Sequence, residues 1–578
     1  MPLSSAETPE TSSVLARVGL ALRAAIRTGY GARQLRGDVV AGLTVGIVAL
    51  PLAIALSIAS GVPPQHGLYS SIVVGAIAAA AGGSRVMVTG TTAAFVVLLA
   101  PVAHRYGVGG LMIASSMAGV ILIVLGLARL GRLIQFIPHP VTTGFTAGIG
   151  VVIGGLQIKD FFGLTTDGLA VHFPDRMIEY GSAFGTMQPW ELAVGAFTLA
   201  VLVVWPKISR KIPSPLVAIT LAALVVWWMS GHVEGFHAST IGSRYGGIPH
   251  TPPAFAWPWN QPDANGHPIG LSLALVRELL STSFAMAALG AIVSLMCAVV
   301  ADGMAGTRHD SNVELVGQGL GNLIGPFFGG FAATGAIART ATGIRAGAVS
   351  PISAITHSVF LLLAVLLLAP LLYWLPMAGL AALLLVVAWN MSAVGNFVHL
   401  IKVAPRSDVL VLLTCFTLTV VFDMTLAVTA GIVLAALLFM QRMSDMFHAK
   451  LDDSHAEHLA NENLAGVVFY EIRGPLFFGA AEKAVSTLAR VNKNAKAVIL
   501  QMDDVPVMDI TGLVALESAI QQLHKARIFV AIAGVQPQPR EVLDKAGIHT
   551  DPAWIAVCDT DQQAIAAVRK HLESHPKG

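Results

Sequence analysis

Long apolar runs separated by short polar connections make up the first three quarters of the chain. A helix that crosses a bilayer needs about 20 apolar residues, or about 17–25 when it tilts. By this criterion the pattern predicts fourteen helical segments, two of which are short. These segments lie near residues 39–58, 67–82, 91–103, 110–130, 140–158, 190–206, 214–230, 281–301, 312–328, 337–347, 351–370, 375–391, 408–423 and 424–441.

The pattern changes near residue 465, where short apolar runs begin to alternate with amphipathic stretches. This alternation is typical of an α/β fold. A further helix is expected between the last two strands. The predicted strands are 467–472, 497–502, 528–535 and 554–557, and the other predicted helices are 477–491, 509–526 and 561–574.

The composition agrees with a membrane protein. Charged residues make up 12% of the chain, against about 25% in soluble proteins, and the mean hydropathy is +0.71. Asp and Glu are absent from 39–159 and from 315–407, whereas about half of the 33 carboxylates follow residue 441. These values exclude a secreted disulfide scaffold, a disordered chain and an ordinary cytosolic enzyme. We therefore expect an α-helical polytopic membrane protein with a C-terminal α/β domain. Its expected parts are a tail at 1–37, a transmembrane domain at 38–441, a linker at 442–463 and the α/β domain at 464–574.

Basic residues indicate the orientation of the helices. In a fourteen-helix count, the Arg-rich tail and the later basic connections fall on the same side of the membrane. Because positive connections stay in the cytoplasm, we expect both termini there, in a cell inner membrane. The start of the chain lacks a cleavable apolar core, so the first spanning segment is expected to act as the insertion signal. The basic connections carry Arg129 and Arg132; Lys207, Arg210 and Lys211; Lys402 and Arg406; and Arg442.

Two short segments interrupt the helical pattern in the same way. Residues 82–94 and 329–340 each contain Gly-Gly, an extended stretch, Thr-Gly and a short helix of small residues. They are the third and the tenth segments, seven apart, as expected of a transporter built from two inverted repeats. Unwound backbone at membrane depth must be buried in protein or line a cavity. The alternative is tight helix packing through small residues.

Two short helices entered from opposite sides of the membrane would direct their N-termini at one site near the midplane. A helix N-terminus offers unpaired backbone N–H groups and about half a positive charge, so it attracts anions. Arg339, in the first turn of the tenth segment, adds a full charge, and its planar guanidinium suits a carboxylate or a sulfate. The alternative is that Arg339 binds backbone carbonyls at a helix end.

Other polar groups favour structural roles. A cluster of polar residues follows the eighth segment, where we expect a cytoplasmic connection and a helix cap. Asp423 falls in a predicted loop, and His104 and His357 are expected at helix ends or interfaces. The cluster consists of Asp302, Arg308, His309, Asp310 and Glu314.

In the α/β part, Asp509 and Thr511 precede an amphipathic helix, which indicates an N-cap. A regulatory phosphorylation or nucleotide site is the alternative for these two residues.

No enzyme or metal-site pattern is found in the sequence. It contains no P-loop, no nucleophile–base pair and no metal-ligand spacing. The widely spaced Cys297, Cys415 and Cys558 are expected to be buried small hydrophobic residues or free thiols. The net charge of +2, with no basic face, predicts no nucleic-acid partner. We therefore expect neither a metal nor another cofactor.

Several stretches resemble one family, the SulP (SLC26) anion transporters. They are 51–70, which resembles the first-helix signature, 302–309 followed by 314–322, and Ala338-Arg339-Thr340 with 347–351. The C-terminal part, with Asp509-x-Thr511-Gly512, is similar to the STAS domain of that family. The resemblance covers nearly the whole chain after residue 37. Within the family, the runs 157–161, 388–392 and 474–478 resemble the branch that transports C4-dicarboxylates.

The resemblance implies a core-and-gate fold of seven plus seven helices in inverted repeat, an elevator-like mechanism and a homodimer in the lipid bilayer. It also implies that the STAS domain regulates or traffics the protein, through a cytoplasmic protein partner or by supporting the dimer. The small anionic substrate would bind among the first, third, eighth and tenth helices. Carried over by position, the site would comprise Ala55, Leu56, Thr91, Thr92, Ser294, Ala338 and Arg339.

Two positions depart from the family pattern. Relatives often have Gly-Pro where this chain has Gly90-Thr91, and the threonine hydroxyl can act as a local cap instead. Relatives frequently carry Glu or Asp where Val293 stands. Because such an acid is the usual candidate for coupling to protons or sodium ions, its replacement predicts weak coupling of transport to pH.

Several functions agree with these features. The leading hypothesis is a secondary transporter of C4-dicarboxylates such as succinate, fumarate or aspartate, and the alternative is a transporter of sulfate or bicarbonate. A nucleobase permease would need carboxylates where Val293, Ala338 and Arg339 stand. An anion channel or a membrane sensor that signals through the STAS domain is a hypothesis of a different class.

Overall fold

The computed structural model describes most of the chain and divides it into two compact units, Met1–Ile432 and Val433–Gly578. Arg132, Arg210, Lys211, Asp423, residues 453–463 of the expected linker and all but the first residue of the helix predicted at 477–491 lie outside the described residues. The described ranges are 14–27, 29–131, 138–167, 170, 172–209, 212–422, 424–445, 448–452, 466–477 and 495–574.

The first unit is helical, and each of the fourteen predicted segments has a helical counterpart, the last of which, Met424–Asp445, continues into the second unit. Within the described ranges, nine helices are long and apolar enough to cross a membrane, which confirms a polytopic helical membrane protein. The remaining predicted segments are short or interrupted helices. The nine spans are Ala32–Ala59, Ala93–Leu127, His139–Phe162, Pro189–Ile208, Ser214–His232, Leu273–Ala305, Ile352–Leu372, Met377–Val403 and Leu426–Ser444.

The elements of the first unit follow one another in two runs of similar order. After η1 (Val14–Arg17) and α1 (Leu20–Arg27), the first run is α2 (Ala32–Ala59), α3 (Pro64–Tyr69), the π-helical turn η2 (Ser70–Val74), α4 (Gly75–Ala81), β1 (Thr89–Gly90), α5 (Ala93–Leu127), α6 (His139–Leu156), α9 (Pro189–Ile208) and α10 (Ser214–His232). The second run is α12 (Leu273–Ala305), α13 (Ser311–Ile324), η6 (Gly325–Phe328), β2 (Thr334–Gly335), α14 (Ile337–Arg345), α15 (Ile352–Leu372), α16 (Met377–Ser392), α18 (Arg406–Val421) and α19 (Met424–Asp445).

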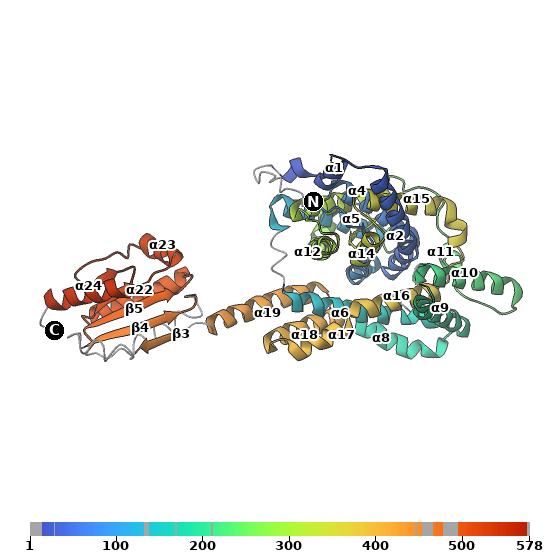
Figure 1. Ribbon diagram of the computed structural model, residues 1–578. Coiled ribbons are helices and arrows are strands. Elements are labelled where there is room, and N and C mark those ends of the chain that lie inside the picture. The colour runs from blue at the N-terminus through green and yellow to red at the C-terminus, as the bar shows by residue number, and fades with distance from the viewer. Residues whose placement is uncertain are drawn as a thin grey trace. The chain divides into compact units, whose positions relative to one another are not determined.

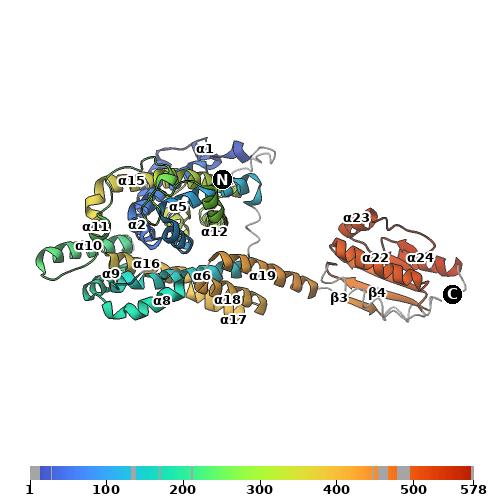
Figure 2. The same ribbon diagram turned by 180° about the vertical axis from the view of Figure 1, so that it is seen from behind.

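These helices form two groups that can be followed in both views (Figures 1 and 2). In the first group, α2 packs against α15 and α14, and α5 packs against α12 and α13. In the second group, α6 packs against α16 and α18, and α9 packs against α10 and α16. Each group therefore combines helices from both runs, so its packing depends on contacts between distant parts of the sequence.

Helix α5 differs from its prediction, because it joins the third and fourth predicted segments. The two parts meet at Gly107, whose φ of 67° is not helical. A Cβ atom at this glycine would lie 2.3 Å from the carbonyl carbon of Asp263. Glycine is therefore required at the break for both its backbone conformation and its space.

The connections contain short helices that the hydrophobic pattern did not indicate. The expected loops at 159–189 and 231–270 carry α7 (Ile158–Phe162), α8 (Phe173–Ser182), η4 (Ala183–Thr186), α11 (Ile241–Tyr245) and η5 (Pro258–Asn260). A further helix, α17 (Val394–Val403), follows α16 after a break at Ala393, where φ is 40°. Each of these helices is too short to span a bilayer by itself, so a search for long apolar runs does not find it as a separate element. Helices α7 and α17 continue the spans His139–Phe162 and Met377–Val403.

The second unit contains a five-stranded sheet in the order β3-β4-β5-β6-β7. Only β3 (His448–Asp452) runs antiparallel to its neighbour; β4 (Val467–Arg473), β5 (Ala497–Asp504), β6 (Phe529–Ala533) and β7 (Ile555–Val557) are parallel. Strand β3 falls inside the segment 442–463, which we expected to be a linker. It is an edge strand in which Ala449 and Leu451 alternate with polar residues, but five residues with two apolar positions are too short a signal to predict a strand.

Helices lie on both faces of this sheet, as the alternation of side chains along its strands requires. Val498 and Leu500 of β5 face one core with α22 (Ile510–Lys525) and α23 (Pro537–Lys545). Ala497 and Ile499 face a second core with α24 (Asp561–Ser574). The second unit is therefore a layered α/β domain, as predicted.

Close packing of α5 on α13 leads to a first prediction. A Cβ atom at Gly119 of α5 would lie 2.4 Å from the backbone nitrogen of Leu323 and 2.7 Å from the oxygen of Gly319. We expect Gly119→Ala to lower the free energy of unfolding by about 1–3 kcal/mol, because backbone atoms cannot yield to the added methyl group. The measurement is the melting temperature in detergent.

Gly303→Ala in α12 is the matched control, since no atom lies within 4 Å of a Cβ at that position. We expect Gly303→Ala to leave the melting temperature unchanged or slightly higher, because alanine favours a helix. Equal melting temperatures for the Gly119 variant and the unmodified protein would contradict the packing argument.

Candidate functional site

Two short strands bring the interrupted segments together in the first group of helices. Strand β1 pairs antiparallel with β2, with Thr89 opposite Gly335 and Gly90 opposite Thr334. The backbone N–H of Ala336 also donates to the oxygen of Val88 at 2.8 Å. Antiparallel pairing is the arrangement expected of equivalent segments in inverted repeats, and it places the N-termini of α5 and α14 close together.

The extended backbone before β2 is satisfied by side chains from several helices. The N–H of Phe331 donates to Ser70 Oγ (2.7 Å), that of Ala332 to Ser115 Oγ (2.9 Å), and that of Gly335 to Ser294 Oγ (3.1 Å). On the other strand, the N–H of Val88 donates to Thr340 Oγ1 at 3.0 Å. This backbone is therefore stable inside the helix bundle without water.

Both helices begin without a side-chain cap. Helix α5 starts after Thr92 and α14 after Ala336, and neither residue's side chain accepts a hydrogen bond from the first turn. The first-turn N–H groups of both helices therefore keep their partial positive charge directed at the region around β1 and β2.

Arg339 lies in the first turn of α14 and is buried, with 3% of its surface exposed. Its Nη1 lies 3.5 Å from Ser71 Oγ and its Nη2 lies 3.4 Å from Thr91 Oγ1, so both hydrogen bonds are long. Within the described ranges, the guanidinium makes no ion pair with a carboxylate. Its charge is therefore removed from water and is balanced only by neutral hydroxyl groups.

Gly90 explains how the guanidinium reaches the strands. A Cβ atom at this position would lie 2.4 Å from Arg339 Nη1 and 3.0 Å from Ser71 Oγ. The Thr-Gly sequence of β1 is therefore needed so that the arginine can lie against the backbone.

The structure brings four of the predicted site residues together around the strands: Thr91, Thr92, Ser294 and Arg339. Thr91 contacts the guanidinium, and Thr92 Oγ1 lies 2.9 Å from Thr334 Oγ1. Ser294 of α12 binds the backbone of β2.

The other predicted positions lie on α2, α12 and α14 and carry no polar side chain. Ala55 and Leu56 are buried in α2, which packs against α14. Ala338 is exposed on the first turn of α14. Val293 is half-buried next to Ser294, so the replaced acid would stand beside the residue that binds β2.

Sequence reasoning missed two hydroxyl groups of this region, those of Ser71 and Thr334. Ser71 lies in η2 and accepts hydrogen bonds from Arg339 and, at 3.4 Å, from the N–H of Thr91. Thr334 pairs with Thr92. Thr334 belongs to the repeated Thr-Gly pattern, which could have indicated it; small hydroxyl residues such as Ser71 are common in packed helices and give no distinct signal.

His357 of α15 is a further buried polar group near the strands. Its surface is fully buried, and neither ring nitrogen has a hydrogen-bond partner among the described residues. The next residue, Ser358, donates to the backbone oxygen of Ser71 at 3.1 Å, so this part of α15 lies against η2. We expected His357 to be an ordinary residue of a helix interface, and the structure places it in such an interface.

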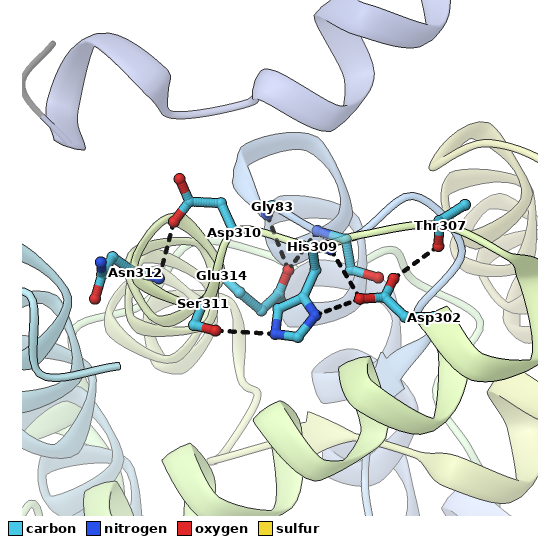
Figure 3. A network of polar contacts seen from close by, with 9 residues as sticks. Gly83, Asp302, Thr307, His309, Asp310, Ser311, Asn312 and Glu314 are labelled. Atoms are coloured by element: carbon cyan, nitrogen blue, oxygen red, sulfur yellow. Dashed lines mark hydrogen bonds and ion pairs between the residues drawn. The ribbon is translucent and has the colours of Figure 1, made fainter. Parts of the chain in front are cut away.

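The polar cluster after the eighth segment forms a connection and a cap, as predicted (Figure 3). Asp310 Oδ1 accepts from the N–H groups of Asn312 (3.0 Å) and Val313 (3.2 Å), and its other oxygen lies 2.6 Å from Arg17 Nη1. His309 Nδ1 lies 2.7 Å from Asp302 Oδ2. Glu314 has different partners and joins α13 to the segment before β1.

In the second unit, Asp509 caps α22, because its Oδ1 accepts from the N–H of Gly512 at 2.7 Å. Thr511 is exposed in the first turn of that helix. Among the described residues, no group of three or more His, Cys, Asp or Glu side chains is arranged to hold a metal ion.

Comparison with protein families gives two matches. Residues 35–415 match the model of the sulfate permease family, and residues 458–564 match that of the STAS domain. The "Putative sulfate transporter YvdB" of Bacillus subtilis is 38% identical over 90% of this chain and 95% of its own length. The "Bicarbonate transporter BicA" of Picosynechococcus is 30% identical over 93% of this chain and 96% of its own length.

Solved structures show the same fold. The structure described as "The overall structure of SLC26A9" aligns with a TM-score of 0.81 and 17% identity over 96% of this chain and 93% of that one. The transmembrane domain of a cyanobacterial BicA aligns with a TM-score of 0.59 and 26% identity over 70% of this chain and 98% of that one. The chain therefore belongs to the sulfate permease (SulP/SLC26) family of membrane anion transporters, which are not enzymes, and it carries the C-terminal STAS domain of that family.

Proposed function

We propose that this protein is a secondary active transporter that binds a small anion between the N-termini of α5 and α14, against the guanidinium of Arg339. The observation that carries the proposal is the burial of Arg339 without a carboxylate partner in the described residues. A buried charge is costly unless it is paired, so an anion that enters the site supplies the missing partner.

The surrounding groups favour the same sign of ligand. Two uncapped helix N-termini face the region, and both attract negative charge. The hydroxyl groups of Ser71, Thr91 and Thr92 lie next to the guanidinium or the strands and can rotate to donate to an anion. A cation would instead meet three positive features, and within the described residues no carboxylate pairs with the guanidinium.

The identity of the anion has two candidates. C4-dicarboxylates, such as succinate, fumarate or aspartate, are the first candidate because three runs of the sequence resemble that branch of the family. Sulfate and bicarbonate are the second candidate, because the relatives described above are named as sulfate and bicarbonate transporters. Neither candidate is favoured over the other. A guanidinium binds the carboxylate and the sulfate group equally well in a bidentate manner, so uptake measurements with purified protein must distinguish them.

The transport movement, the assembly and the role of the STAS domain are parts of the same proposal. The two groups of helices are suited to an elevator-like movement, in which the group that holds β1 and β2 carries the anion past the other. We propose a homodimer in the cell inner membrane with both termini in the cytoplasm, where the STAS domain meets a regulatory protein. Asp509 caps its helix, and the exposed Thr511 stays the candidate for modification.

The first test of this function is Arg339→Ala in proteoliposomes. Uptake of radiolabelled succinate, fumarate, aspartate, sulfate and bicarbonate is measured with the unmodified protein to identify the transported anion. We expect Arg339→Ala to lower uptake of that anion by about 100-fold, since a buried charge-assisted contact is worth about 1.5–3 kcal/mol and the helix ends alone bind weakly.

The matched control is Arg345→Ala, which removes an exposed arginine from the last turn of the same helix. We expect this variant to transport at the native rate. Native uptake by the Arg339 variant would refute the anion site, whereas current without saturation in the unmodified protein would indicate a channel.

The second test concerns coupling to protons. We expect similar uptake at about pH 5 and about pH 8, with or without an inward proton gradient, because Val293 stands where relatives carry an acid that titrates in the membrane. Val293→Glu is expected to introduce a dependence on the proton gradient. Strong dependence in the unmodified protein would contradict the prediction.

A further inference from the structure

One face of α13 carries three polar side chains at intervals of four residues: Glu314, Gln318 and Asn322. Residues at this spacing lie on the same side of a helix. All three are buried, with 1% of their surface exposed. Because polar groups in such a place are costly unless they are hydrogen-bonded, their partners show what this face of the helix holds.

Glu314 holds the segment that leads into β1. Its Oε2 accepts hydrogen bonds from the backbone N–H groups of Gly83 and Ser84, both at 2.9 Å, and its Oε1 accepts from Gln318 Nε2 at 3.0 Å (Figure 3 shows Glu314 with Gly83). Hydrogen bonds to a carboxylate are stronger than those between neutral groups. A Cβ atom at Gly83 would lie 2.4 Å from the oxygen of Asp310, so the segment fits closely against the start of α13.

Gln318 reaches β1 itself. Its Nε2 donates to Thr89 Oγ1 at 2.6 Å as well as to Glu314. The amide nitrogen faces the carboxylate because only the NH₂ group can donate to it. Thr89 is the residue that pairs with Gly335, so α13 contacts the first strand at its pairing position.

Asn322 holds the other strand from the same helix face. Its Nδ2 donates to the oxygen of Ala333 at 2.9 Å, and its Oδ1 accepts from the N–H of Ala333 at 2.7 Å. Both backbone groups of the residue before β2 are therefore bound by one side chain. None of the hydrogen bonds of Glu314, Gln318 and Asn322 involves the Arg339 guanidinium.

We propose that Glu314, Gln318 and Asn322 form a positioning ladder that fixes the two strands, and hence the N-termini of α5 and α14, at the separation that the anion requires. The inference rests on the proposed anion site. It states that the α13 ladder determines how tightly that site binds its anion. A site held at its binding separation does not lose free energy in assembling around the ligand, so its affinity is higher than that of a loosely held one.

The experiment removes the contact between Gln318 and Thr89 from either side. Thr89→Val keeps the shape of the side chain and removes the acceptor, and Gln318→Met keeps the length and removes the donor. We expect Thr89→Val to raise KM about fivefold with little change in maximal rate, because it removes one hydrogen bond between positioning groups. Gln318→Met should raise KM at least as much, because it also removes the hydrogen bond to Glu314. The double variant should raise KM no further than Gln318→Met alone, because Gln318→Met already removes the contact with Thr89. Thr89→Ser, which keeps the hydroxyl group, should return KM to its native value.

Thr198→Val in α9 is the matched control, because Thr198 is buried and its hydroxyl donates only to its own helix, to the oxygen of Val194 at 2.7 Å. We expect both valine variants to lower the melting temperature slightly. Only Thr89→Val should raise KM, measured for the anion that the uptake panel of succinate, fumarate, aspartate, sulfate and bicarbonate identifies as transported. The comparison of Thr89→Val with Thr89→Ser decides the question even where Gln318→Met does not fold.

A native KM for Thr89→Val, or an equal rise in KM for Thr198→Val, would overturn the ladder. If Arg339→Ala still lost uptake in that case, the proposal of the anion site would stand although the ladder had been refuted. Native uptake in Arg339→Ala, in contrast, would refute the anion site itself.

Discussion

The pairing of β1 with β2 is the constraint on which the helical unit depends. Two extended segments lie among apolar helices, where each unpaired backbone group would be costly, and the four residues of the two strands satisfy only part of this demand. The remaining groups are bound by side chains from η2, α5, α12, α13 and α14, which explains why so many small polar residues occur in these apolar helices. Because the strands are held from all these directions, two helices can begin in the interior with uncapped N-termini, and the positive charge of Arg339 can be held beside them.

Glycine residues at close contacts and the scarcity of carboxylates both support this arrangement of the strands and Arg339. Gly90 leaves space for the guanidinium, and Gly119 and Gly319 let α5 approach α13, which in turn holds both strands. The absence of carboxylates from 39–159 and 315–407 leaves Arg339 without a local partner in sequence, and the fold brings none to it within the described residues. The single buried carboxylate of α13, Glu314, is bound by N–H groups of Gly83, Ser84 and Gln318 rather than by the arginine. The positive character of the region therefore results from both the sequence and the packing.

Prediction from sequence succeeded where the signal was local. The interrupted segments, the two Thr-Gly pairs and the cap formed by Asp509 depend on neighbouring residues, and the structure shows them as expected. Helices α8 and α17 and strand β3 were missed, because they are short or polar and gain their stability from contacts with other elements. Ser71 and the partners of Glu314 were missed for a different reason. The contacts of Ser71 with Arg339 and of Glu314 with residues 83 and 84 join positions more than 200 apart, and hydrophobic periodicity contains no information about such pairs.

The π-helical turn Ser70–Val74 gives the second segment one more residue than an α-helical turn would have. Its two serines bind different parts of the site: Ser70 accepts from Phe331 beside β2, and Ser71 accepts from Thr91 and Arg339 beside β1. Since each residue of an α-helix rotates the chain by about 100°, a deletion of one residue here would turn the following part of the segment away from its partners. The length of this segment is therefore as constrained as its composition.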